Sequence, residues 1–223
     1  MNPRSSPPTT AVAGLTAVLL LTGCGGGDGV DGAKTADKAS STPTTTGASA
    51  SASPSASASA SADGRPKITL PSDVTLTFEG GRTGDAVKDA VLADSAEMTR
   101  AVDAAIAGTD PKGQGMGYYT TGKALEASLS WVAQFKKADV TITGAVRYYD
   151  RKVTLESKTS AVLTYCGDES KGFSKDKKTG KVNKTPVTKD SYVTYNTRLD
   201  RNSDGVWQTS QIISTRGAAQ CQP

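Results

Sequence analysis

The sequence predicts an α+β domain in which two N-terminal helices pack on one face of an antiparallel sheet. Two observations support this fold class. Apolar residues recur at helical spacing over 85–107 and 121–137 and then, from residue 140 onward, at the period of two that is typical of strands. Most of the predicted strands therefore follow the helices in one block, which favours an α+β arrangement over alternating parallel units.

The chain begins with a segment, 1–23, that has the design of a secretory signal peptide. A polar start with Arg4 leads into an apolar run from Ala11 to Leu21, which is shorter than the roughly 20 residues needed to span a bilayer. The run ends in the tetrapeptide LTGC at 21–24, and this motif resembles the lipobox of bacterial lipoprotein precursors. The resemblance implies cleavage before Cys24 and attachment of a diacylglycerol to its thiol, which would anchor the mature protein to the outer face of the cell membrane. An ordinary signal peptide followed by a chance cysteine is the alternative.

Residues 24–66 consist mainly of Gly, Ala, Ser, Thr and Pro. Such a composition buries too little apolar surface to offset the entropy of ordering the backbone, about 1–2 kcal/mol per residue, so we expect a disordered tether. A flexible coil of about 40 residues has an end-to-end distance of roughly 35 Å, which would let the folded part stand off the membrane. The serine and threonine hydroxyls are candidates for glycosylation, with a plain spacer as the alternative.

Residues 67–223 have the length of one domain with its own core. The whole chain carries a net charge of +4, too low for the concentrated basic face of a nucleic-acid interface, so no nucleic acid is expected as a partner. Much of the excess charge lies in a Gly/Lys/Thr-rich segment, 171–189. We expect a solvated loop there, with attraction to anionic lipid or envelope polymers as the alternative.

A first strand is expected at 73–78, where apolar residues alternate with threonines. The helix at 85–107 is expected to end at Gly108, and its polar face comprises Lys88, Asp89, Arg100 and Asp103. A glycine-rich stretch, 113–119, is expected to be flexible. The helix at 121–137 is expected to bury a stripe formed by Leu125, Leu129, Val132 and Phe135. The later strands are expected at 140–143, 145–155, 160–166, 191–199 and 206–215.

Several motifs of this region together resemble a known family. They are Tyr118-Tyr119 before the second helix, RYYD at 147–150 within a strand, Cys166 at a strand end, the DGVW hairpin at 204–207, Arg216-Gly217 and Cys221. In this pattern the domain is similar to secreted Gram-positive lipoproteins with the cone-shaped fold of nuclear transport factor 2. The resemblance implies a sheet that curves around a helix, often with a pocket inside the cone. The family includes binding modules and enzymes such as ketosteroid isomerase.

The cysteine count agrees with export of the chain. With Cys24 lipidated, Cys166 and Cys221 remain as an even pair in an oxidising compartment, so a disulfide is expected between them. Two free or metal-binding thiols are the alternative. Because the chain contains no histidine, a lone cysteine pair would make a poor zinc site. A calcium-like pattern at 200–205 lacks the glutamate that would complete the loop, since Gln211 takes its place, so neither metal nor cofactor is expected.

The absence of histidine also limits the chemistry that the domain can perform. It excludes Ser-His-Asp and Cys-His arrangements and leaves Asp, Glu, Tyr or Lys for acid–base work, which requires burial to bring their pKa values toward neutrality. Asp150 and Glu156 are the candidate carboxylates on strands. Exposed partners for neighbouring arginines or lysines are the alternative role for both.

The expected function is non-catalytic binding of a small molecule or of a cell-envelope partner by a domain held on the lipid bilayer through Cys24. Tyr118, Tyr119 and Trp131 are the candidate residues of a pocket rim, because aromatic rings with a polar tip suit an adaptable binding mouth. The alternatives are an enzyme of the isomerase or dehydratase type on the same fold and a scaffold protein without a pocket. A carboxylate with a raised pKa in an apolar pocket would favour the enzyme, and a large exposed apolar patch would favour the scaffold.

Overall fold

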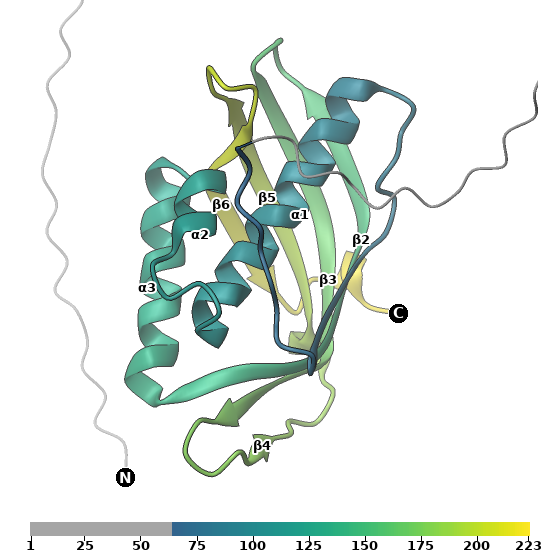
Figure 1. The fold of residues 1–223 in the computed structure, drawn as a ribbon. Coiled ribbons are helices and arrows are strands. Elements are labelled where there is room, and N and C mark those ends of the chain that lie inside the picture. Colours follow the sequence, from purple (N-terminus) through teal and green to yellow (C-terminus); the bar gives the residue numbers. More distant parts are fainter. Residues whose placement is uncertain (1–63) are drawn as a thin grey trace, which may run out of the picture. The chain divides into compact units, whose positions relative to one another are not determined.

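The computed structural model describes residues 64–223 (Figure 1). The predicted signal peptide, Cys24 and nearly all of the predicted tether lie outside the described residues. Within the described part, the elements are β1 (Val74–Phe78), α1 (Ala86–Ala107), α2 (Gln114–Tyr119), α3 (Gly122–Ala138), β2 (Val140–Leu155), β3 (Ser160–Asp176), β4 (Val182–Asn183), β5 (Tyr192–Arg201) and β6 (Trp207–Arg216). The three helices cover one face of a curved sheet, as expected of an α+β fold (Figure 1). No helix of residues 64–223 is both long enough and apolar enough to cross a membrane.

The sheet is mixed, which corrects the expectation of a purely antiparallel one. Its strands are ordered β1-β2-β3-β5-β6, with β4 paired to β3. β2, β3, β5 and β6 are antiparallel neighbours, whereas β1 runs parallel to β2 with Val74 opposite Gly144. The reason is topological: the three helices form a crossover between β1 and β2, and a connection of that length brings the chain back to the same end of the sheet.

A glycine in β2 allows a close approach between β2 and β3. Gly144 has φ 96°, and a Cβ at this position would overlap the carbonyl oxygen of Lys171 on β3. Because only glycine fits there, the strands expected separately at 140–143 and 145–155 form one strand that bends at residue 144. β3 continues to Asp176, so the first part of the lysine-rich segment is strand rather than the expected loop.

The helix α1 begins and ends where its capping residues predict. The Asp85 carboxylate accepts hydrogen bonds from the backbone N–H groups of Val87 (2.9 Å) and Lys88 (3.2 Å), and Gly108 ends the helix with φ 84°. Its buried side chains supply much of both large core clusters, in which Trp207 and Tyr119 are the largest fully buried residues. α1 is therefore the central helix of the domain.

The segments around α2 and α3 differ from the expectation in two respects. The glycine-rich stretch forms the short helix α2, because the Asp110 carboxylate accepts the N–H groups of Gln114 (3.1 Å) and Gly115 (2.8 Å). In α3, the buried positions are Ala124, Ser128 and Val132, while Leu129 is 52 % exposed. The predicted stripe was wrong at Leu129, because the helix face that α3 buries is the one with Ala124, Ser128 and Val132 at four-residue spacing.

Two links fasten the ends of the described chain. Cys166 on β3 and Cys221 near the C-terminus form a disulfide, and Cys221 is fully buried. At the other end, the Arg65 guanidinium forms an ion pair with Asp94 of α1, whose side chain is 3 % exposed. Asp94 also accepts the backbone N–H of Trp207 at 2.8 Å. The folded region therefore includes Arg65, which the sequence interpretation assigned to the tether.

Candidate functional site

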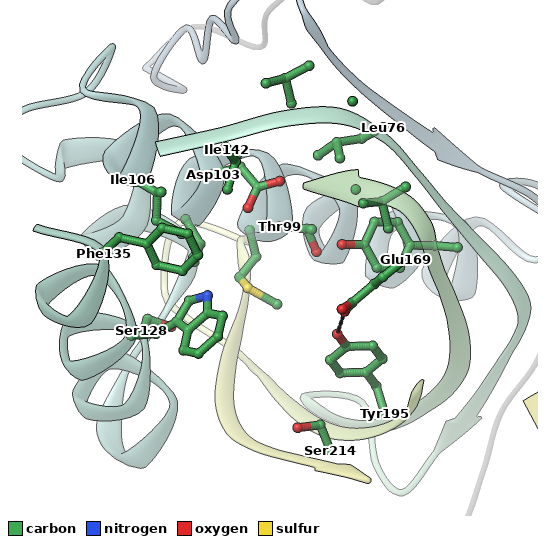
Figure 2. A pocket seen from close by; sticks show the side chains of 18 of the residues that line it. Leu76, Thr99, Asp103, Ile106, Ser128, Phe135, Ile142, Glu169, Tyr195 and Ser214 are labelled. Carbon is green, nitrogen blue, oxygen red and sulfur yellow. Dashed lines mark hydrogen bonds between the residues drawn. The ribbon is translucent and has the colours of Figure 1, made fainter. Parts of the chain in front are cut away.

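A cavity of about 560 Å³ lies between the helices and the face of the sheet that they cover (Figure 2). This volume is in the range of roughly 300–1,000 Å³ that is typical of small-molecule sites. α1 and α3 form one wall, and β1, β2, β3, β5 and β6 form the other. The cavity is the inside of the curved sheet, closed by the two longer helices.

The periodicity of each element determines which side chains reach the cavity. α1 contributes Met98, Thr99, Val102, Asp103 and Ile106, and α3 contributes Ala127, Ser128, Trp131 and Phe135, at the three- and four-residue spacing of one helix face. β2 and β6 contribute mainly alternate residues, which are Ile142, Gly144, Val146 and Tyr148 on β2 and Ile212, Ser214 and Arg216 on β6. Thr143 on β2 and the consecutive residues 172–174 on β3 also line the cavity. More than half of the lining is apolar, and the charged lining residues are Asp103, Glu169 and Arg216.

The opening of the cavity is marked by the lining residues that are also exposed. They are Ala127 and Trp131 on α3 and Ser214 and Arg216 on β6. Trp131 is 44 % exposed and its ring packs edge-on against Phe135, with the centroids 5.1 Å apart. The rim thus combines an aromatic ring with an arginine side chain.

Asp103 is the polar group of α1 in the cavity. Figure 2 shows its carboxyl group projecting from the helix into the space between α1 and the sheet. Within residues 64–223 it receives no hydrogen bond and forms no ion pair. Burial, and in second place the negative charge of Glu169, raise the pKa of Asp103 from 3.8 to about 7. At neutral pH this carboxyl can therefore either donate or accept a proton.

Glu169 on β3 is the second carboxylate of the cavity, and it has partners. The Tyr195 hydroxyl donates a hydrogen bond to it at 2.8 Å, the dashed line in Figure 2, and Arg216 forms an ion pair with it at 2.8 Å. Its charge is thus balanced at the rim. The two carboxylates of the cavity have different environments, because only Asp103 lacks a partner within the described part of the chain.

Three tyrosines line the sheet side of the cavity: Tyr148 on β2, Tyr165 on β3 and Tyr195 on β5. The rings of Tyr165 and Tyr195 stack with centroids 4.8 Å apart, and Tyr148 meets both edge-on. Gly167 makes room for them, because a Cβ there would lie 3.0 Å from the Tyr195 ring. Burial raises the pKa of all three phenols above their ordinary value, so their hydroxyl groups stay protonated.

The residues singled out from the sequence are only partly brought together. Trp131 lies at the cavity rim, but Tyr118 and Tyr119 do not line the cavity. Tyr119 is 1 % exposed and packs in the core, because α2 turns its ring toward α1 and α3 rather than toward the opening. Asp150 and Glu156, the candidate carboxylates, are exposed residues outside the cavity, and Glu156 pairs with Arg198 at 2.7 Å.

Sequence reasoning missed the residues that define this site. Asp103 was assigned to a polar, solvent-facing side of the first helix, and Glu169 was not singled out. The available signal was positional: Asp103 lies three residues before Ile106 and four after Thr99, so it shares a helix face with an apolar residue. No group of three or more metal-ligating side chains occurs in residues 64–223.

No protein-family model matches the sequence, and no curated protein sequence matches it. Solved structures with a similar arrangement include a ketosteroid isomerase-like protein of Erwinia carotovora (16% identity, 60% of this chain and 98% of that one, TM-score 0.37). Another is a protein of Catenulispora acidiphila (11% identity, 58% of this chain and 93% of that one, TM-score 0.40). A third is the intermembrane space region of the chloroplast protein ARC6 (10% identity, 60% of this chain and 98% of that one, TM-score 0.37). At these values the similarity says nothing about the function of this chain.

Proposed function

We propose that the domain binds a small, largely apolar molecule in the cavity between α1, α3 and the curved sheet. The observation that carries this proposal is the cavity itself, about 560 Å³ with walls that are more than half apolar and with polar groups from both the helices and the sheet. A folded core of this size normally fills such a space with side chains, since empty apolar volume costs stability. A space that is left open and reaches the surface suits a ligand.

The test uses a neutral apolar dye, N-phenyl-1-naphthylamine, whose fluorescence rises when it leaves water. Val102 lines the cavity, so Val102→Trp should fill it and abolish the fluorescence rise while circular dichroism shows a folded protein. Val187→Trp is the matched control, because Val187 is 60 % exposed and does not line the cavity. An equal fluorescence rise with both variants would show that the dye binds elsewhere.

We further propose that the protein is a lipoprotein of the extracytoplasmic face of the cell membrane, anchored through acylated Cys24. The LTGC motif at 21–24 supports this location. So does the Cys166–Cys221 disulfide, since structural disulfides are rare in reducing compartments. Cys24→Ala should abolish membrane retention and labelling with radioactive fatty acid. Undiminished labelling of the variant would contradict the anchor.

A second candidate function is catalysis by proton transfer, of the isomerase or dehydratase type. It is favoured by Asp103, whose pKa of about 7 and open position in the cavity suit a general base or acid. The protonated hydroxyls of Tyr148 and Tyr165 are the donors available on the opposite wall to stabilise a developing oxyanion.

Exchange of carbon-bound hydrogen separates this candidate from simple binding. An enzyme of this type should catalyse deuterium uptake α to the carbonyl of small cyclic ketones in D₂O, with a rate that rises through about pH 7. Asp103→Asn should abolish the uptake while dye binding persists. Dye binding by the native protein without any uptake across the ketone panel would leave binding as the function.

A further inference from the structure

The charged side chains of the cavity differ in whether each has an oppositely charged partner. Among its lining residues, α1 contributes Asp103, β3 contributes Glu169 and β6 contributes Arg216, while the lining residues from α3, β1, β2 and β5 carry no charge. Arg216 is already paired with Glu169 at 2.8 Å, and its side chain is 51% exposed at the rim. The charge without a counter-ion inside the cavity is therefore that of Asp103.

This unbalanced carboxylate is costly to the protein without a ligand. A carboxylate that leaves water without gaining a partner loses several kcal/mol of solvation in ordinary protein interiors. Asp103 projects into the cavity and no other described residue donates a hydrogen bond to it, and burial raises its pKa to about 7. A ligand that brought a positive charge and a donor to Asp103 would remove the cost and lower the pKa again.

The titratable groups that face Asp103 add no cation to the cavity. Tyr148 and Tyr165 on the facing strands stay protonated and neutral, and the Tyr195 hydroxyl is engaged with Glu169. An anionic ligand would be repelled by Asp103 and would find the one lining arginine already paired. Aromatic rings from both walls, among them Trp131 on α3 and Phe173 on β3, offer π-faces that attract cations.

We infer that the cavity selects small organic cations, in which a protonated primary or secondary amine on an apolar body donates to the Asp103 carboxylate while the body lies against the aromatic walls. This inference rests on the proposed binding function and names its ligand class. The site thereby differs from cavities that bind neutral or acidic lipids, because the unpaired charge in this cavity is negative.

The test compares three ligands with one body and different head groups: 4-phenylbutylamine, 4-phenylbutanol and 4-phenylbutyrate. Each is titrated against the full chain at pH 8 by displacement of N-phenyl-1-naphthylamine. The amine should bind at least tenfold more tightly than the alcohol, and the carboxylate should bind most weakly. At pH 5, where Asp103 is protonated, the advantage of the amine over the alcohol should fall severalfold.

Asp103→Asn should remove the preference for the amine while leaving the alcohol bound. Asp89→Asn is the matched control, because it makes the same charge change on α1 at a residue that does not line the cavity, and it should keep the preference. Equal affinity for amine and alcohol in the native chain, or an unchanged preference in Asp103→Asn, would overturn the inference and leave the binding function standing. Failure of the dye and of all three ligands to bind would overturn both.

Discussion

Replacing Asp103 by asparagine should make the protein more stable at neutral and alkaline pH. The carboxyl has an ordinary pKa of 3.8, and burial with the charge of Glu169 raises it to about 7. A raised pKa means that the folded state holds this proton more tightly than the unfolded state does. The stabilisation from the proton is therefore complete below about pH 4 and is lost as the pH rises through 7.

The size of the effect follows from the shift. About three pH units at roughly 1.4 kcal/mol each set an upper bound of about 4 kcal/mol for the cost of ionised Asp103 above pH 7. Solvent screens part of this cost, because the residue is only partly buried. We therefore expect Asp103→Asn to raise the free energy of unfolding by about 2 kcal/mol at pH 8, and by less than half as much at pH 5.

Urea unfolding of the full chain at pH 5 and pH 8 measures both values. Asp89→Asn is the control with the opposite sign. The Thr83 N–H and hydroxyl donate to Asp89 at 2.6 and 2.8 Å and lower its pKa, so its contribution is present at neutral pH and lost in acid. That variant should be less stable than the native protein at pH 8. A loss of stability in Asp103→Asn at pH 8, or a gain that does not depend on pH, would refute the reasoning.

Three further predictions concern the framework of the cavity. Arg65→Ala should lower the free energy of unfolding by about 3 kcal/mol, because it leaves the carboxylate of Asp94 buried without its cation. Urea unfolding measures this loss, and Arg65→Lys should recover part of it. Full stability of the alanine variant would contradict the role of the ion pair. Gly144→Ala should abolish the cooperative thermal transition or lower its midpoint by more than 10 °C, because the new Cβ would clash with the backbone of β3. An unchanged melting curve would show that the bend does not depend on glycine. Replacing Cys166 and Cys221 by serine should lower the free energy of unfolding by about 4 kcal/mol, since the disulfide spans a sequence separation of 55 residues. Equal urea midpoints for the oxidised, reduced and serine forms would count against this value.

The sequence predicted the two longer helices and most of the strands because their signals are local. The capping residue Asp85, the terminating Gly108 and the switch to alternating β-branched residues after 140 all act within a few positions of the chain. The pairing of β1 was missed, since its direction depends on where the crossover returns rather than on the residues of the strand. Likewise the bend at Gly144 results from the close approach of a strand that lies 27 residues later at Lys171.

The site was harder to predict than the fold for a physical reason. A charged residue on a helix beside apolar ones is usually an edge residue facing water, and Asp103 follows that pattern in sequence. It faces a cavity only because the sheet curves away from α1 and leaves the space unfilled. Tyr119 shows the reverse error, since its position after a glycine run suggested a pocket rim, whereas Tyr119 is buried in the core at the end of α2.

The ion pair of Arg65 with Asp94 has a mechanical consequence. A pull from the N-terminal side reaches this pair before it reaches β1, which is an edge strand of the sheet. Asp94 belongs to α1 and holds the backbone of Trp207 at the start of β6, so the load passes into the centre of the domain. β1 carries Val74 and Leu76 of the cavity wall. If the protein is held by its N-terminal segment, the Arg65–Asp94 pair would transmit the force to α1 and so prevent β1 from separating from the sheet.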